Sequence, residues 1–194
     1  MRAVRRVSGR AMPLDRADVD TDQIIPAHWL KRVERTGYGA GLFEAWRRDP
    51  AFVMNDPRYA GATILVAGAN FGSGSSREHA VWALEEVGFR AVIAPRLADI
   101  FRANCLKSGL VPVELDADTV ATLLRLAESD PQAEVTVDVE RRTVEAPGVR
   151  ASFALDDYAR TRLLEGLDDI AVTLAHADEI TAYEARRSVW LPKI

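Results

Sequence analysis

The sequence predicts an α/β fold built around one mixed sheet with helices beside it. Three observations support this class. Short apolar runs rich in β-branched residues recur along the chain, helical patterns separate them, and two closely spaced strand patterns follow near residue 140. Strands that alternate with helices favour parallel pairing, whereas the later pair favours an antiparallel hairpin. We therefore expect a mixed central sheet flanked by helices, in a single domain covering residues 1–194.

Local signals place the elements of the N-terminal half. The arginine-rich start is followed at once by acidic residues, which argues against a transit peptide and favours a first strand over residues 3–7. The acidic run at residues 18–22 has the composition of a turn and a helix cap. The apolar run at residues 62–67 is long enough for a buried strand. Ser75 and Glu78 have the spacing of a capping box, which predicts that the next helix begins at Ser75.

The second half supplies the rest of the sheet and its helices. A proline at position 112 predicts that its strand lies at an edge or ends there. Glycines at positions 88, 109 and 166 are placed as helix stops. The expected segments are a strand at 91–94, a helix from 95 to 109, a strand at 110–115, a helix at 118–128, a hairpin of 135–139 and 143–145, a strand at 152–155, and a helical C-terminal segment at about 156–190.

Composition narrows the class of function. A net charge of −4 gives no general attraction to nucleic acid or to an anionic membrane, and no apolar run approaches transmembrane length. Cys105 is the only cysteine, so this chain can form no intrachain disulfide and can hold no iron–sulfur cluster or structural zinc site. Its position on an apolar helical stripe favours a buried, inert thiol. These features predict a cytoplasmic protein without a metal site.

The stretch from Gly68 to Ala80 is the candidate functional site. It joins a predicted strand to a predicted helix, and Gly72 and Gly74 permit backbone conformations that a side chain would block. The N–H groups at the start of the helix can hold an anion, and Arg77 supplies a fork of donors that suits a carboxylate or phosphate. The alternative is a tight turn whose serines only cap the helix.

A second candidate lies in the loop at about residues 30–43. Lys31, Arg32 and Arg35 crowd before three closely spaced glycines. One interpretation is a flexible lid that brings cationic side chains over an anionic ligand. The other is a solvated loop, and the stretch alone does not decide between them.

Four motifs together carry a family resemblance. They are Gly72–Ala80 (GSGSSREHA), Asp18–Pro26 (DVDTDQIIP), Arg35–Gly39 with Leu42-Phe43, and Leu167–Ile170 with Ala182–Glu184. The first resembles the signature of the aconitase superfamily's swivelling domain. With the others, in the same order over nearly the whole chain, the sequence resembles the small subunits of bacterial 3-isopropylmalate dehydratase.

The resemblance implies a swivelling β/β/α fold and half of a two-chain hydro-lyase. The reaction it implies converts 2-isopropylmalate into 3-isopropylmalate through 2-isopropylmaleate, in leucine biosynthesis. The family's large subunit would be the partner and would carry a [4Fe-4S] cluster.

The resemblance also assigns expected roles to residues. Ser75 would be the catalytic base, Arg77 would bind a substrate carboxylate, and Ser76 would support the loop or bind substrate. Gly72 and Gly74 would supply the loop backbone. The loop cations Lys31, Arg32 and Arg35 would fall where the family contacts the variable group of a small dicarboxylate.

Two alternatives stay open at this point. One is the small subunit of a related hydro-lyase that acts on citramalate, maleate or a homoaconitate-type substrate, since the central motif would be the same. The other is a free-standing protein that binds an anion at the glycine turn without catalysis.

Overall fold

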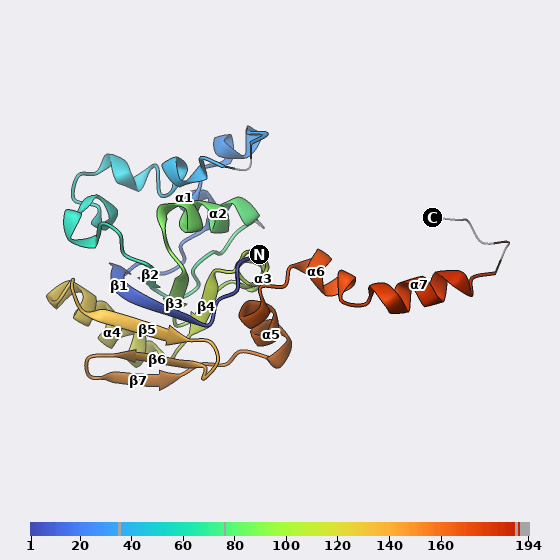
Figure 1. Ribbon diagram of the computed structural model, residues 1–194. Helices are drawn as coiled ribbons and strands as arrows, with labels where there is room; N and C mark the ends of the chain where they lie inside the picture. Colours follow the sequence, from blue (N-terminus) through green and yellow to red (C-terminus); the bar gives the residue numbers. More distant parts are fainter. Residues whose placement is uncertain (35, 76, 189, 191–194) are drawn as a thin grey trace.

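The computed structural model describes residues 1–34, 36–75, 77–188 and 190, and its strands form one seven-stranded sheet (Figure 1). The strand order is β4-β3-β2-β1-β5-β6-β7. The strands are β1 (Arg6–Leu14), β2 (Ile64–Ala67), β3 (Ala91–Ala94), β4 (Val111–Glu114), β5 (Glu134–Asp138), β6 (Thr143–Ala146) and β7 (Val149–Ser152). Strands β1 to β4 pair in parallel and β1, β5, β6 and β7 pair antiparallel, so the predicted mixed sheet is confirmed.

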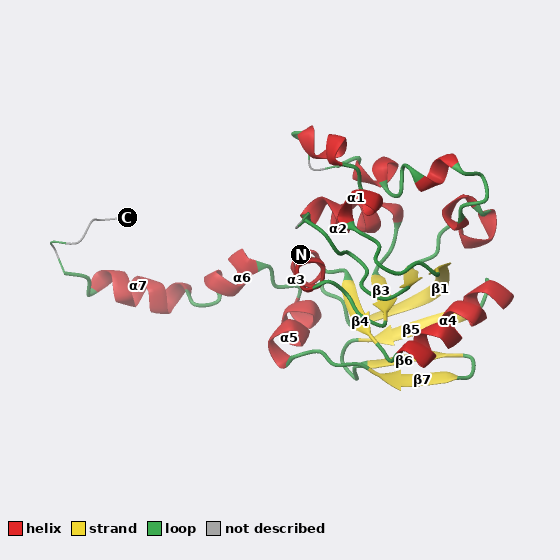
Figure 2. Ribbon diagram, turned by 180° about the vertical axis from the view of Figure 1, so that it is seen from behind, coloured by secondary structure: helices red, strands yellow, loops and turns green. Residues whose placement is uncertain are grey.

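Helices cover both faces of this sheet (Figure 2). The helices of the described chain are α1 (Thr21–Ile24), α2 (Glu78–Val87), α3 (Asp99–Ser108), α4 (Ala117–Ser129), α5 (Asp157–Glu165), α6 (Asp169–Leu174) and α7 (Ala177–Ala185), of which α6 and α7 lie away from the sheet. Among the described residues, the connection between α1 and β2 contains five short 3₁₀ turns: Ala27–Lys31, Tyr38–Gly41, Trp46–Arg48, Val53–Asn55 and Pro57–Tyr59. As expected, β4 lies at an edge of the sheet, and Gly88, Gly109 and Gly166 end their helices in the left-handed conformation.

Successive side chains of the central strands point alternately into two separate hydrophobic cores, one on each face of the sheet, because side chains alternate across a strand. In β2, Leu65 and Ala67 belong to the core shared with α2, α3 and the 3₁₀ region. Ile64 and Val66 belong to the opposite core, which packs on α4 and α5. All four side chains are fully buried, which explains why the run is continuously apolar rather than alternating.

Two predicted strand positions were wrong. The first strand begins at Arg6, not Ala3, and continues to Leu14, because residues 11–14 pair with β2 throughout its length. The last strand is Val149–Ser152 rather than 152–155, because Gly148, with φ +74°, makes a tight turn that returns the chain beside β6. Residues beyond Ser152 still contribute Phe153 to the core.

The predicted start of α2 was also wrong. The helix begins at Glu78, Arg77 occupies the N-cap position without a side-chain cap, and no capping box joins Ser75 to Glu78. Gly74 has φ +88°, and the Ser75 carbonyl accepts a hydrogen bond from Thr21 Oγ1 at 2.9 Å, so Ser75 belongs to the loop and not to the helix. A capping box does form at α1, between Asp20 and Gln23.

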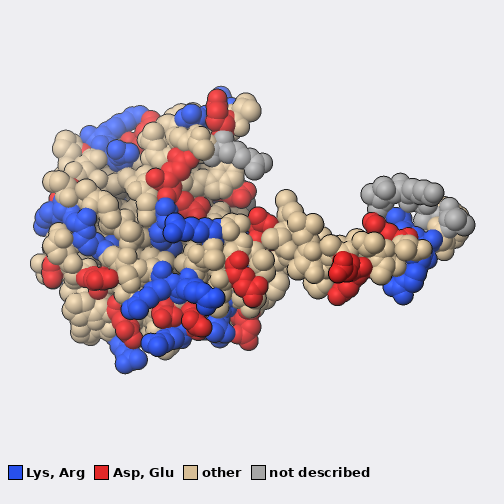
Figure 3. All heavy atoms as spheres, viewed as in Figure 1, with Lys and Arg blue, Asp and Glu red and all other residues tan. Residues whose placement is uncertain are grey.

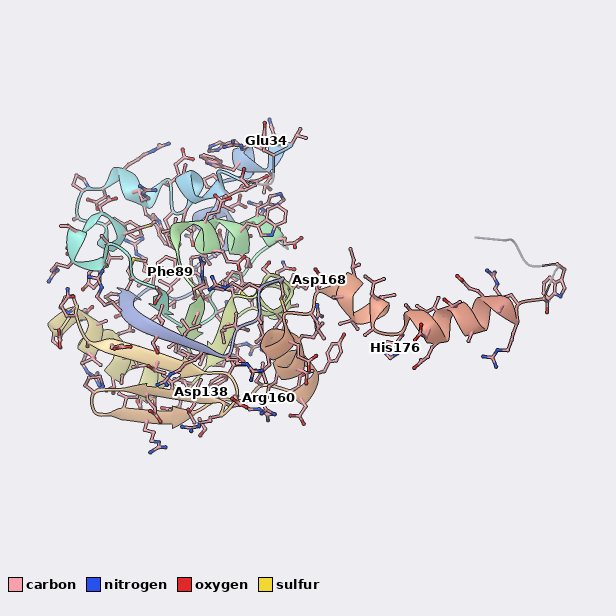
Figure 4. All side chains as sticks on the ribbon, in the orientation of Figure 1. Glu34, Phe89, Asp138, Arg160, Asp168 and His176 are labelled. Carbon is pink, nitrogen blue, oxygen red and sulfur yellow. The ribbon has the colours of Figure 1, made fainter. Side chains whose placement is uncertain are left out.

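Residues 168–188, the C-terminal arm, project away from the rest of the molecule, and the two opposite views agree on this (Figures 1 and 2). The arm contains α6 and α7. Asp168 caps the start of α6, and His176 lies between the two helices; both are labelled in Figure 4. This part of the predicted helical segment therefore contributes nothing to either core.

Candidate active site

The glycine loop at residues 68–75 follows the carboxyl end of β2, where ligands bind in open α/β sheets. Backbone hydrogen bonds hold it between two neighbouring segments. On one side the Gly72 N–H donates to Val19 O at 2.8 Å, and the Thr21 N–H donates to Ser73 O at 2.9 Å. On the other side the Ala98 N–H donates to Phe71 O at 2.9 Å. These bonds on both sides fix the backbone of the loop.

Two glycines are required by this geometry. Gly72 and Gly74 have φ +80° and +88°, in the region that side chains disfavour. A Cβ on Gly72 would also lie 2.3 Å from Phe101 Cγ, whose ring packs edge-on against Phe71. Both backbone conformations are ones that glycine adopts readily, as predicted. The contribution of Gly72 and Gly74 to catalysis stays a prediction.

Ser75 is exposed and lines a hollow of about 230 Å³. Its Oγ lies 3.5 Å from Thr21 Oγ1, so the two hydroxyls are within hydrogen-bonding distance, and both residues line the hollow. The lining continues through Gly72, Gly74, Arg77 and the start of α3 from Ala98 to Phe101. A small ligand can therefore reach the serine hydroxyl and the arginine from the same opening.

Arg77 is held by an acid that sequence reasoning missed. Its guanidinium donates to both carboxylate oxygens of Asp22, the second of them at 2.8 Å, and to Ile25 O at 3.4 Å. The Arg77 side chain is 13% exposed, whereas that of Asp22 is 56% exposed. In the sequence, Asp22 belongs to an acidic run with the composition of a turn. The only sign that it belongs to the candidate site was its place in the Asp18–Pro26 motif. The fork orients Arg77 and leaves other N–H donors of its guanidinium unused.

The structure does not bring Lys31 or Arg32 to the Ser75 hollow. Arg32 stacks over the Trp29 ring with its Cζ 5.2 Å from the centroid, and its Nε lies 3.8 Å from Glu34 Oε2. Lys31 is exposed and does not line the hollow. Glu34, labelled in Figure 4, marks the outer end of this loop. Ser76 and Arg35 lie outside the described residues, so their predicted roles stay predictions.

The glycines that follow these cations make defined contacts rather than an open chain. The N–H groups of Gly37 and Gly39 donate to the two carboxylate oxygens of Glu86 in α2, at 2.9 and 2.8 Å. The Tyr38 ring between them is buried, 5.1 Å from the ring of His79. His79 thus packs against the loop through Tyr38. Movement of the loop on ligand binding stays a prediction.

The described residues provide no ligand set for a metal cluster. They contain no group of three or more His, Cys, Asp or Glu side chains placed to share an ion. Cys105 lies fully buried in α3, and burial raises the pKa of its thiol well above the usual value, so it stays protonated. The predicted inert thiol is confirmed in position. Within the same residues, no helix is both long and apolar enough to cross a membrane.

Comparisons with known proteins agree with the resemblance in the sequence. The family model described as the aconitase C-terminal domain matches residues 1–118. The model LeuD_N matches residues 121–157. A third model, described as the C-terminal domain of the 3-isopropylmalate dehydratase small subunit, matches residues 169–193.

Relatives over the whole chain carry the same description. The 3-isopropylmalate dehydratase small subunit of Streptomyces coelicolor is 60% identical over 193 residues, covering 100% of this chain and 98% of the relative. That of Parafrankia sp. is 62% identical over 185 residues, covering 95% of each chain. The crystal structure of 3-isopropylmalate dehydratase (leuD) from Methanocaldococcus jannaschii matches with a TM-score of 0.66 and 26% identity, covering 92% of this chain and 99% of that one.

Proposed function

The chain belongs to the family of 3-isopropylmalate dehydratase small subunits, and from this premise we propose how its candidate site takes part in the reaction. As the small subunit of a hydro-lyase it acts with a large subunit. The proposed substrate is 2-isopropylmalate, which loses water to give 2-isopropylmaleate. Water then adds back with the opposite orientation to give 3-isopropylmalate, a step of leucine biosynthesis.

Ser75 is the proposed base for the carbon-bound proton. That proton is weakly acidic, and an ordinary serine hydroxyl is far too weak a base at neutral pH. The serine therefore has to act as an alkoxide, which needs positive potential around its oxygen. The groups proposed to provide that potential are Arg77, which lines the same hollow, and the N-terminus of α2, which begins three residues after Ser75. The observation that carries this proposal is that Ser75, an exposed residue, lines a hollow shared with Arg77.

Arg77 is the proposed anchor for a substrate carboxylate, and Asp22 its positioning residue. The Asp22 carboxylate fixes the plane of the guanidinium through two hydrogen bonds. The remaining donors can bind a second carboxylate at the hollow. Such a bond places the carbon beside that carboxylate close to Ser75, where its proton can be removed.

The partner is proposed to carry the [4Fe-4S] cluster, because the described residues of this chain offer one buried thiol and no ligand group. When bound, the cluster would serve as a Lewis acid for the leaving hydroxyl group. The complex then combines a base from one chain with a metal centre from the other. A cytoplasmic location belongs to the same proposal and is supported by the single, unpaired cysteine.

Replacing Ser75 with alanine tests the base. The Ser75→Ala chain, reconstituted with a cluster-loaded large subunit, should lose kcat by about 10³-fold or more, while its circular dichroism and its binding to the large subunit stay unchanged. Ser73→Ala is the matched control, because Ser73 holds the loop through its backbone and should keep full activity. Normal turnover by Ser75→Ala contradicts the base assignment.

A substrate panel tests the reaction. The wild-type pair should convert 2-isopropylmalate with a higher kcat/KM than citramalate, maleate or homoaconitate-type substrates. A clear preference for any of these would transfer the proposal to a related hydro-lyase. Tight binding of a dicarboxylate by this chain alone, without turnover by the pair, would favour an anion-binding protein instead.

A further inference from the structure

The C-terminal arm is bound to the body of the molecule at its first residues, Asp168 and Asp169, which form its root. Beyond this root it makes no hydrogen bond or ion pair to the rest of the described chain. Asp168 accepts hydrogen bonds from the Ala171 N–H at 2.8 Å and from the N-terminal ammonium of Met1 at 3.3 Å. Asp169 forms an ion pair with Arg162 at 2.7 Å. Among the residues that the structure describes, the hydrogen bonds and ion pairs of residues 170–188 all remain within the arm. The body of the molecule therefore sets the arm's starting direction and supplies no surface for it.

The arm carries large apolar side chains that remain exposed in the described chain. Ile170 is 72% exposed, Leu174 65%, Ile180 39% and Tyr183 61%. Figure 3 shows uncharged side chains over much of α6. The two helices have six and nine residues, and isolated helices shorter than about 12–15 residues are marginal in water. A folded arm of this kind needs an apolar surface to lie on.

The apolar residues are placed to meet one surface in each helix. Ile170 and Leu174 are four residues apart in α6, and Ile180 and Tyr183 are three apart in α7. Residues at these spacings lie on the same side of a helix. Thr181 and Ala185 point to the other side of α7, since each is displaced by more than a quarter turn from Ile180.

The position of the arm indicates which partner covers it. Helix α3 lines the Ser75 hollow at its first residues, and at its other end Lys107 Nζ lies 4.0 Å from Asp169 at the arm's root. Ile100, near the start of α3, is 51% exposed. A protein that closes over the Ser75 hollow thus meets a continuous surface that runs along α3 to the arm.

The domain descriptions point the same way. The part of the chain up to residue 118 matches a C-terminal domain of aconitase, which by its name is joined to a longer chain. The arm matches a separate model that belongs to small subunits. A small subunit, as the relatives are described, needs a non-covalent hold on the rest of the enzyme.

We propose that the C-terminal arm is the docking element that holds the large subunit, with Ile170, Leu174, Ile180 and Tyr183 seated in an apolar groove of that subunit. The inference rests on the proposed function, because it takes the large subunit as the occupant. It adds that binding affinity resides largely in the arm, away from the residues that handle substrate.

Charge insertion on the apolar side of α7 tests this. The double variant Ile180→Glu/Tyr183→Glu should bind the purified large subunit at least tenfold more weakly in a titration followed by activity or light scattering. At saturating concentrations of the variant, kcat and KM should return to wild-type values, since the substrate site is untouched. The matched control, Thr181→Glu/Ala185→Glu, adds two charges on the other side of the same helix and should bind normally.

Each result decides the inference. Unchanged affinity in the Ile180→Glu/Tyr183→Glu variant overturns it. So does a dimer of the isolated chain that the same variant converts to monomer, because the occupant is then a second copy. If the wild-type pair assembles through the arm but does not convert 2-isopropylmalate, the proposed reaction fails while the docking role stands. If the wild-type pair converts 2-isopropylmalate and the variant assembles normally, the docking role fails while the proposed reaction stands.

Discussion

Replacing Arg77 with lysine separates charge from geometry at the candidate site. The guanidinium binds both oxygens of Asp22 while keeping further donors for substrate, which an ammonium on a flexible stem cannot do. The change removes about one charge-assisted hydrogen bond to the substrate carboxylate, worth about 1.5–3 kcal/mol. Because about 1.4 kcal/mol corresponds to a factor of ten, KM should rise by about 10- to 150-fold.

The cost to folding should be much smaller than the cost to binding. The Asp22 carboxylate is more than half exposed, and pairs with such screening contribute about 1 kcal/mol or less. We expect the melting temperature of the Arg77→Lys chain to fall by about 2–4 °C. Steady-state kinetics with saturating large subunit, together with thermal denaturation, measure both effects on the same preparation.

An unchanged KM in Arg77→Lys would refute the carboxylate role. Asp22→Asn then tests the positioning role separately, because it weakens the hold on Arg77 and leaves the guanidinium in place. We expect KM to rise a few-fold in this variant. A lower KM would mean instead that Asp22 competes with substrate for Arg77.

Two further predictions concern the scaffold. Gly72→Ala should destabilise the chain by about 3 kcal/mol, from the positive φ and the clash with Phe101, and lower the melting temperature by about 6–12 °C. Gly148→Ala is its control, with a similar φ and no atom near the added Cβ, and should cost about 1 kcal/mol; equal losses in both would contradict the clash. Burial raises the pKa of Glu85 from 4.5 to about 7, so the folded state keeps a proton that the unfolded state releases, and stability should fall as pH rises from about 4.5 to 7. In urea titrations, Glu85→Gln should show a smaller loss of stability over this pH range. At pH 8 it should be more stable than the wild type by about 1 kcal/mol, a value reduced for solvent screening of the partly exposed carboxyl. An unchanged pH profile would contradict the raised pKa of Glu85.

The parts of the fold that local patterns determine were predicted well. The strand at 91–94, the helix stops and the antiparallel hairpin depend on apolar runs and glycines that lie next to each other in the chain. The start of α2 depends on a distant partner. Thr21 draws the Ser75 backbone away from the helix, and no local signal reports a contact across 54 residues.

The candidate site divides in the same way. Ser75 and Arg77 stand together in one motif, so their shared hollow was expected. The Asp22–Arg77 pair joins two motifs and could be found only by asking why both occur in one chain. The position of Arg32 could not be predicted in this way. A positive charge near a glycine-rich stretch does not determine where the side chain points, and Arg32 packs over the Trp29 ring.

Helix α2 has one further consequence through Glu86. Arg77 occupies the N-cap position of this helix, and Glu86, near its C-terminal end, accepts hydrogen bonds from the N–H groups of Gly37 and Gly39. Because the Glu86 carboxylate accepts hydrogen bonds only from main-chain N–H groups of the loop, changes in the side chains of residues 31–34 leave both hydrogen bonds in place. Those side chains can therefore vary without displacing Arg77, which lies at the other end of the same helix.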